Sequence, residues 1–130
     1  EIAACALGAS GVAADFAFVP HSGPFARGIH VTVQAMLKAA RDSGQVLDAL
    51  REFYRGAPFV QVAAEAPHVK DVAASNYARI SAAANGRSVA VTCVVDNLNK
   101  GAAGGAMQWM NRLFDLPEAA GLAAPAAGWT

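Results

Sequence analysis

Residues 94–108 hold the side chains with the clearest capacity for chemistry. This stretch runs from an apolar strand through the polar pair Asp96-Asn97 into a glycine-rich turn and then an apolar-striped helix. Lys100 and Gly101 fall at the N-terminus of that helix, where free N–H groups and the helix dipole favour an anion. Asn97 offers a donor and an acceptor, as a carboxamide ligand requires, but an Asx turn at the strand end is an equally good interpretation.

A second candidate is the loop that follows Pro20. It contains His21 and Arg27, six residues apart in a stretch with two glycines and a proline. The planar guanidinium of arginine matches a carboxylate or a phosphate, so both side chains together would suit an anionic substrate. The alternative is a solvated loop, which the residues alone favour.

The other reactive residue types form no recognisable site. His30 and His68 have no partner at metal-ligand spacing, so they receive no role and no metal site is expected. Cys5 and Cys93 lie in apolar surroundings without a Cys-x-x-Cys pattern. We therefore expect buried free thiols, with a disulfide or metal site as the minority alternative. The sequence has no strand–GxGxxG–helix unit and no Gly-Cys nucleophile motif.

Composition indicates one folded domain over residues 1–130. Hydrophobic residues make up 55% and charged residues 15%, and ten basic residues balance ten acidic ones. No net field therefore steers the chain to nucleic acid or to a membrane, and no apolar run reaches the roughly 18–20 residues of a membrane span. The first residues lack both an initiating Met and the basic region of a signal peptide, so we expect a fragment or processed chain from the cytoplasm.

The first half of the chain alternates between strand, loop and helix patterns. We expect strands over residues 16–20, 29–37 and 59–62, and a loop over 21–28. Residues 1–8 are too short to decide. Asp42 and Gln45 have the spacing of a capping box, and the helix that follows should end near Gly56. Its apolar face is predicted to comprise Val46, Leu47, Leu50, Phe53 and Tyr54.

The second half contains a hairpin and a final helix. Asn85-Gly86 predicts a type I′ turn between strands 77–84 and 87–95, and the second strand is apolar enough to lie inside a sheet. A helix is expected over about 102–114, followed by an irregular tail with Trp129 as a possible anchor. The apolar stripe of this helix comprises Ala103, Met107, Met110 and Phe114. This order predicts an α+β domain with a mixed, largely antiparallel sheet.

Three segments resemble the N-acetyl-gamma-glutamyl-phosphate reductase family. Residues 18–29 are similar to its Pro-His…Arg-Gly loop, and residues 74–76, which follow Pro67-His-Val69, are similar to its small-Ser-Asn turn. Residues 96–104 with Gln108, Met110-Asn111 and Gly121-Leu122 resemble its closing signature. Gly105 and Trp109 depart from the residues common there, Gln and Asn.

The resemblance implies a glyceraldehyde-3-phosphate dehydrogenase-like C-terminal domain with helices on one face of the sheet. The family reduces N-acetyl-glutamyl phosphate to its semialdehyde with NADPH, in arginine biosynthesis, through a cysteine nucleophile and a histidine acid/base. Both catalytic residues and the Rossmann domain would lie upstream of this chain. By resemblance, the substrate side comprises His21 and Arg27, and the nicotinamide side comprises Asp96, Asn97, Lys100, Gly101 and Gly104.

The same resemblance implies a substrate and oligomerisation domain that self-associates through its sheet. Residues 101–130 would then pack on the Rossmann domain, and the chain alone would be inactive. Two alternatives stay open. One is a related reductase acting on aspartyl or aminoadipyl phosphate, and the other is a non-catalytic assembly module on the same fold.

Overall fold

The computed structural model describes residues 1–128. The chain forms, in order, α1 (Ile2–Ser10), β1 (Ile29–Met36), α2 (Ser43–Phe53), β2 (Val60–Val62), β3 (Ala78–Asn85), β4 (Ser88–Val95) and α3 (Gly104–Leu113). A 3-10 turn, η1 (Val69–Asp71), precedes β3, and a π-helical turn, η2 (Asn99–Ala103), leads into α3.

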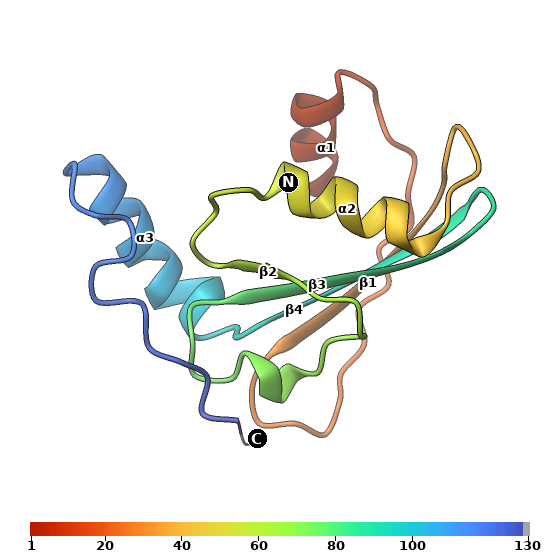
Figure 1. Cartoon of the computed structure of the whole chain (residues 1–130). Coiled ribbons are helices and arrows are strands. Elements are labelled where there is room, and N and C mark those ends of the chain that lie inside the picture. Colours follow the sequence, from red (N-terminus) through yellow and green to blue (C-terminus); the bar gives the residue numbers. More distant parts are fainter. Residues whose placement is uncertain (129–130) are drawn as a thin grey trace.

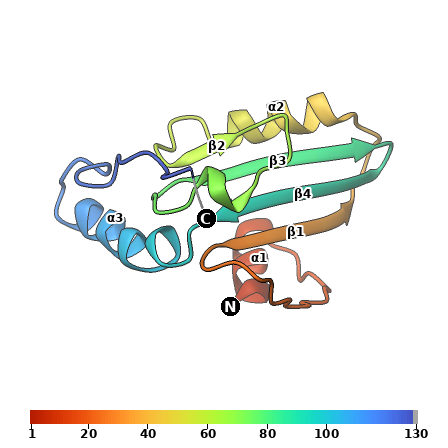
Figure 2. The same ribbon diagram turned by 90° about the horizontal axis from the view of Figure 1, so that it is seen from below.

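The strands form one four-stranded sheet in the order β1-β4-β3-β2. β4 is antiparallel to both β1 and β3, whereas β2 runs parallel to β3. Figure 2 shows the four strands side by side, with α3 beyond one end of the sheet. The expected α+β class and mixed, largely antiparallel sheet are confirmed, and the apolar strand β4 is an inner strand as predicted.

One face of the sheet is apolar, and α2 covers only part of it. α2 lies against β3 and β2, where Leu47 of the helix and Ile80 of β3 are buried. Figure 1 shows α1 and α2 on the same side of the sheet. Over β1 this face stays open, since its residues Ile29, Val31 and Val33 are between 44% and 55% exposed. The hydrophobic core beneath α2 therefore includes β2 and β3 but does not extend over β1.

β1 is also an open edge. It is eight residues long, it is exposed along its whole length, and it contains no charged residue. Within residues 1–128, no strand pairs with the edge that faces away from β4. Natural sheets usually protect such edges with charges, prolines or a covering segment.

The expected capping box of α2 is confirmed. The Asp42 carboxylate accepts a bond from the Gln45 backbone N–H at 2.8 Å, and the Gln45 side chain accepts one from the Asp42 N–H at 3.2 Å. The predicted apolar face is wrong at its C-terminal end, because Phe53 is 78% exposed and only Leu47 of this helix is buried. Phe53, the last residue of α2, packs edge-on against Tyr54 instead, with the two ring centres 4.9 Å apart.

The hairpin is confirmed, but its predicted turn type is wrong. Asn85 pairs with Ser88, so the two loop residues are Gly86 and Arg87 rather than Asn85 and Gly86. Gly86 has φ of 62°, whereas Arg87 does not have a positive φ. A positive φ at the first loop residue alone is the pattern of a type II′ turn, which requires glycine at that position.

The N-terminal segment differs from its prediction in two ways. Residues 16–20 form no strand, since they pair with no strand of the sheet within residues 1–128, and Phe18 and Val19 are exposed. Of the undecided residues 1–8, Glu1 is the N-cap of α1 and the others lie in this helix, where Cys5 is exposed rather than buried. Cys93 is half-buried, and both thiols are free as expected.

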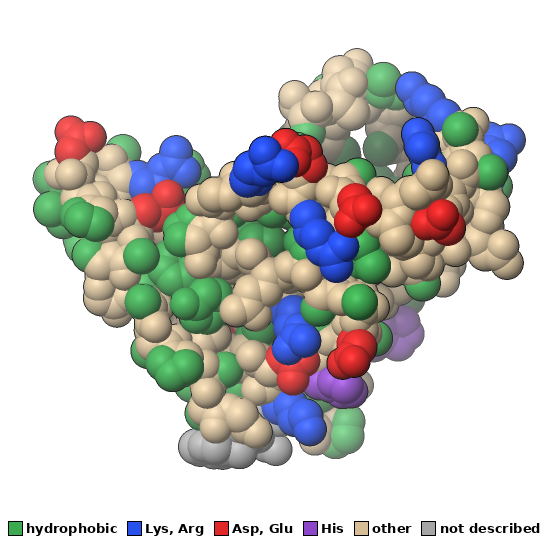
Figure 3. All heavy atoms as spheres, viewed as in Figure 1, with side chains coloured by type: hydrophobic (Ala, Val, Ile, Leu, Met, Phe, Trp, Pro, Cys, Tyr) green, Lys and Arg blue, Asp and Glu red, His purple; other side chains and the backbone are tan. Residues whose placement is uncertain are grey.

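The last helix begins two residues later than predicted, because residues 99–103 form the wider π-helical turn. Met107, Met110 and Phe114 of its stripe are between 40% and 72% exposed, as expected for a stripe without a partner in this chain. Figure 3 shows hydrophobic side chains gathered around α3 and the segment after it, whereas the charges are scattered. Trp129 lies outside the described residues. Within residues 1–128, no helix has the length and apolar character needed to cross a membrane.

Candidate functional site

The candidate site is built around Asp96, which directly follows β4. Its side chain is fully buried, and it forms a two-point contact with the Arg27 guanidinium. Arg27 Nη2 donates to Asp96 Oδ1 at 2.8 Å, while Arg27 Nε lies 2.7 Å from Oδ2 without being aligned for a hydrogen bond. Two segments 69 residues apart in sequence are thereby joined at one end of the β1–β4 pair.

Three backbone N–H groups complete the surroundings of this carboxylate. Oδ2 accepts from Ala74 at 2.6 Å, and Oδ1 accepts from Leu98 at 2.9 Å and from Asn99 at 2.8 Å. Burial by itself would raise the pKa of Asp96, but the hydrogen bonds from Arg27 and these backbone groups outweigh it and lower the pKa to about 2. A carboxylate offers about four acceptor positions, so none remains for a ligand.

A second contact fixes the same end of the β1–β4 pair, which is called the Asp96 corner below. The Asn97 side-chain oxygen accepts a bond from the Gly28 N–H at 2.6 Å. Gly28 has φ of 114°, and a Cβ at this position would overlap Val69 of η1. Only glycine suits both the backbone conformation and the close approach. Arg27 and Gly28 are therefore held against the end of β4 and against η1.

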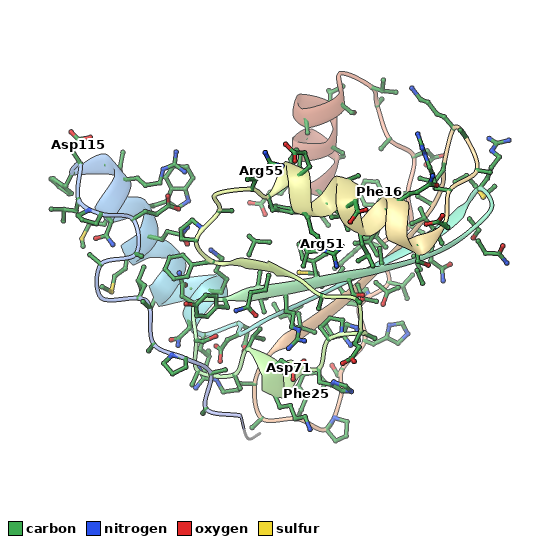
Figure 4. All side chains as sticks on the ribbon, viewed as in Figure 1. Phe16, Phe25, Arg51, Arg55, Asp71 and Asp115 are labelled. Carbon is green, nitrogen blue, oxygen red and sulfur yellow. The ribbon has the colours of Figure 1, made fainter. Side chains whose placement is uncertain are left out.

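His21 is not joined to this cluster by any hydrogen bond within the described residues. Its side chain is exposed, and its Nδ1 lies 3.1 Å from the carbonyl of Val19 in the same loop. Figure 4 shows Phe25 of this loop and Asp71 of η1 on the side of the sheet away from α2. Of the predicted site residues, the structure thus brings together Arg27, Asp96 and Asn97.

Lys100 turns towards the sheet and α3 rather than into solvent. Its Nζ donates to Gln108 Oε1 at 2.5 Å and lies 5.5 Å from the centre of the Phe59 ring. Gln108 in turn accepts from Asn76 Nδ2 at 3.1 Å and donates to Glu118 at 2.5 Å. Burial lowers the pKa of the Lys100 ammonium, an effect that the charge of Glu118 opposes. This network sets the position of α3 relative to the sheet.

The sequence-based reasoning missed this network. The sequence patterns place Asn76 only in a turn motif and Gln108 only in the closing signature, and they assign nothing to Glu118. No signal in a single sequence connects the three, because they are brought together only by the angle at which α3 leaves the sheet. An open cavity of about 290 Å³ lies beside Lys100 and Gln108 and is lined by Gly105, Trp109 and Arg112.

The two glycines of the predicted turn differ in what they do. A Cβ on Gly104 would overlap Asn76 Oδ1 and lie 3.0 Å from the carbonyl of Asn99, so the start of α3 approaches Asn76, in the turn before β3, only because this residue has no side chain. A Cβ on Gly101 would lie 3.7 Å from the Asp96 carbonyl, an ordinary contact. Asn76 Oδ1 has no hydrogen-bond partner within residues 1–128 and lines a second cavity of about 200 Å³.

Within residues 1–128, no three histidine, cysteine, aspartate or glutamate side chains gather as a metal site. Two side-chain groups at the end of β4 remain available as hydrogen-bond donors. Arg27 Nη1 and Asn97 Nδ2 have no partner among the described residues, and neither atom is sealed from solvent. Such groups can orient a carbonyl, carboxylate or phosphate oxygen.

Comparison with known proteins gives a consistent result. Residues 1–97 match the family described as the semialdehyde dehydrogenase dimerisation domain. N-acetyl-gamma-glutamyl-phosphate reductase from Symbiobacterium thermophilum is 50% identical over 109 residues, 81% of this chain and 31% of that protein. The reductase of the same name from a Bradyrhizobium strain is 46% identical over 86% of this chain and 35% of its own length, and that from Rhodopirellula baltica is 39% identical over 94% and 37%.

The chain spans about a third of the length of these relatives. The family match includes the loop with Arg27 and Gly28, the sheet, and the pair Asp96-Asn97, which are the parts that build the site. The chain therefore belongs to the semialdehyde dehydrogenase dimerisation domain family.

Proposed function

We propose that the chain is the C-terminal substrate-binding and oligomerisation part of an NADP-dependent N-acetyl-gamma-glutamyl-phosphate reductase. The observation that carries this proposal is the fixed position of Arg27. Asp96 holds one side of its guanidinium, while Nη1 stays open to solvent. A guanidinium held in this way suits the anionic groups of an acyl phosphate. The names of the relatives support the same reaction class.

Within this proposal, Arg27 and His21 lie on the substrate side, and the segment from Asp96 to Gly104 lies on the nicotinamide side. Asp96 contributes by holding the turn, because its oxygens are already occupied. Lys100 contributes through its bond to Gln108, which fixes the first turn of α3. The nucleophilic cysteine and the acid/base histidine would come from other parts of the protein.

The residues of this chain fit one edge of the cofactor rather than the whole dinucleotide. Residues 101–103 of the turn are exposed, and the outward group of Asn97 is a donor that matches a carboxamide oxygen. When bound, NADPH would supply the hydride for the reduction. The chain itself would orient the substrate and hold the turn against which the nicotinamide rests.

The proposal includes self-association. The family is described as a dimerisation domain. The apolar residues of β1 are open to solvent, and burial of such a surface is the usual source of a stable interface. We propose that the protein acts in the cytoplasm. Its ligands would be small acyl phosphates rather than nucleic acid.

A chimera tests the proposal. This chain replaces the matching C-terminal third of the Symbiobacterium reductase, and NADPH oxidation is measured with N-acetyl-glutamyl, aspartyl and aminoadipyl phosphates. We expect turnover with the N-acetyl-glutamyl substrate and little with the other two. Preference for another acyl group would identify the related reductase, and a folded chimera inactive with all three would indicate a non-catalytic assembly module.

A further inference from the structure

The cavity of about 200 Å³ that Asn76 lines is bordered by the turn before β3, the start of α3 and the tail that follows α3. We call it the Asn76 cavity. Met107, Leu122 and three alanines give it an apolar wall, and Ser75, Asn76 and Asn99 add polar groups. Apolar walls with a few placed polar groups are typical of sites for small molecules.

The Asn76 side chain is buried with one of its two polar atoms unpaired. The residue is 3% exposed, and its Nδ2 donates to Gln108 Oε1 at 3.1 Å. Turning this amide round would bring two oxygens together, so Oδ1 points the other way, against Gly104 of the cavity wall. Within residues 1–128 this Oδ1 has no hydrogen-bond donor. Buried oxygens nearly always have a donor, so one is expected from a molecule in the cavity.

The neighbouring polar side chains do not supply this donor. The Ser75 hydroxyl already donates to the Val72 carbonyl at 2.7 Å. The Asn99 side chain forms no hydrogen bond within the described residues, so its amide is free to donate to a ligand oxygen. The cavity therefore offers one acceptor, one donor and an apolar surface. A secondary amide complements this set, because it carries an N–H, a carbonyl oxygen and an apolar end.

We propose that the Asn76 cavity binds a secondary amide. The amide N–H donates to Asn76 Oδ1, the carbonyl oxygen accepts from Asn99, and the apolar end packs on Met107 and Leu122. Within the proposed function, the group that it takes is the N-acetyl amide of the substrate. The identity of this natural ligand rests on the proposed function, whereas the binding of an amide does not depend on it.

The position of the cavity suits an acetylated substrate. Ala74 of the cavity wall donates its N–H to Asp96 Oδ2 at 2.6 Å, and the same carboxylate accepts from Arg27 at 2.8 Å. The cavity and the proposed anion site thus adjoin one carboxylate, as two contacts to one small substrate require. Aspartyl and aminoadipyl phosphates carry an ammonium group where this substrate has its amide. An apolar cavity with one acceptor disfavours that charge, so the cavity would select the acetylated substrate.

A pair of small ligands tests the amide contact. N-methylacetamide has the amide N–H, whereas N,N-dimethylacetamide has a methyl group in its place. Each is titrated into the purified chain and followed by NMR of the methionine methyl groups, because Met107 lines the cavity and Met36 and Met110 do not. We expect the Met107 signal to shift and N-methylacetamide to bind about fivefold tighter, as one hydrogen bond allows. An unshifted Met107 signal, or equal affinities for the two amides, would overturn the proposal.

Two matched substitutions test whether this binding occurs in the cavity. Ala124→Leu narrows the cavity with a larger side chain, whereas Ala123→Leu makes the same change at a residue that does not line it. Both positions are exposed, so both variants should fold. The affinity for N-methylacetamide should fall about tenfold or more in Ala124→Leu and about twofold or less in Ala123→Leu. Equal losses would refute the site, and the ligand pair remains a complete test if a variant does not fold.

The chimera supplies a readout for the natural substrate. Ala124→Leu should raise KM for N-acetyl-glutamyl phosphate and leave KM for NADPH nearly unchanged. A rise confined to NADPH would assign the cavity to the cofactor and refute the acetyl assignment, as would turnover that does not respond to Ala124→Leu. Binding of N-methylacetamide at Met107 without any turnover of the chimera would instead reject the proposed function and retain the amide site.

Discussion

Asp96 should make the stability of this chain depend on pH in a defined window. Its folded pKa is about 2, compared with an ordinary value of 3.8. At about 1.36 kcal/mol per pKa unit, this difference contributes about 2 kcal/mol to the free energy of unfolding. Because the folded pKa is lowered, the contribution is complete above the ordinary pKa and is lost as the pH falls from about 4 towards 2.

The variant Asp96→Asn isolates this contribution. At neutral pH it should lower the free energy of unfolding by about 3–5 kcal/mol, since it removes the charge and also leaves the Ala74 N–H facing another donor. Urea unfolding, followed by circular dichroism from pH 6 to pH 2, gives the difference between the two proteins at each pH. That difference should shrink by about 2 kcal/mol over the acid part of the range.

The control is Asp48→Asn, which removes an exposed ion pair to Arg51 on α2. Exposed pairs contribute about 0–1 kcal/mol, so this variant should unfold almost like the original chain at every pH. If the difference for Asp96→Asn stayed constant between pH 6 and pH 2, the ionised carboxylate would not be the stabilising species, and the account of the corner would be wrong.

Three further predictions concern other parts of the chain. Gly104→Ala should be strongly destabilising in thermal unfolding, because its Cβ overlaps Asn76, whereas Gly101→Ala should be tolerated; equal effects would contradict the close approach of α3. Burial raises the pKa of the Cys93 thiol, so iodoacetamide at pH 8 should modify the exposed Cys5 first. Peptide mass spectrometry measures both labelling rates, and faster labelling of Cys93 would refute this prediction. Light scattering should show a dimer or larger assembly, and substitution of lysine for Val31 and Val33 should weaken this assembly. A monomer at high protein concentration would show that β1 does not form an interface between chains.

Local patterns predicted those parts of the fold that depend on neighbours in the sequence. The capping box at Asp42, the β3–β4 hairpin and the inner position of β4 follow from spacing and apolar runs. The predicted strand at 16–20 failed because a strand requires a partner, which periodicity cannot reveal. The turn type failed because Asn85-Gly86 satisfies two hairpin registers, and only the pairing of Asn85 with Ser88 distinguishes them.

The residues proposed for the site could be named from the sequence, but the contacts between them could not. Motif resemblance indicated Arg27, Asp96 and Asn97 as functional residues. It gave no sign that Arg27 and Asp96 bind each other, which depends on the register of β1 with β4. The contact between the Lys100 ammonium and Gln108 was likewise not indicated by any sequence pattern. Side-chain direction is decided by tertiary packing, so a single sequence cannot supply it.

The open edge of β1 has a practical consequence for how the stability of this chain is measured. An uncharged strand of eight residues, exposed on both sides and unpaired along one edge within the described residues, can form backbone hydrogen bonds with another chain. Any melting temperature will then rise with protein concentration, because assembly and folding share one equilibrium. A lysine placed in the middle of β1 should therefore make the melting temperature less dependent on protein concentration, without changing the contacts around Asp96.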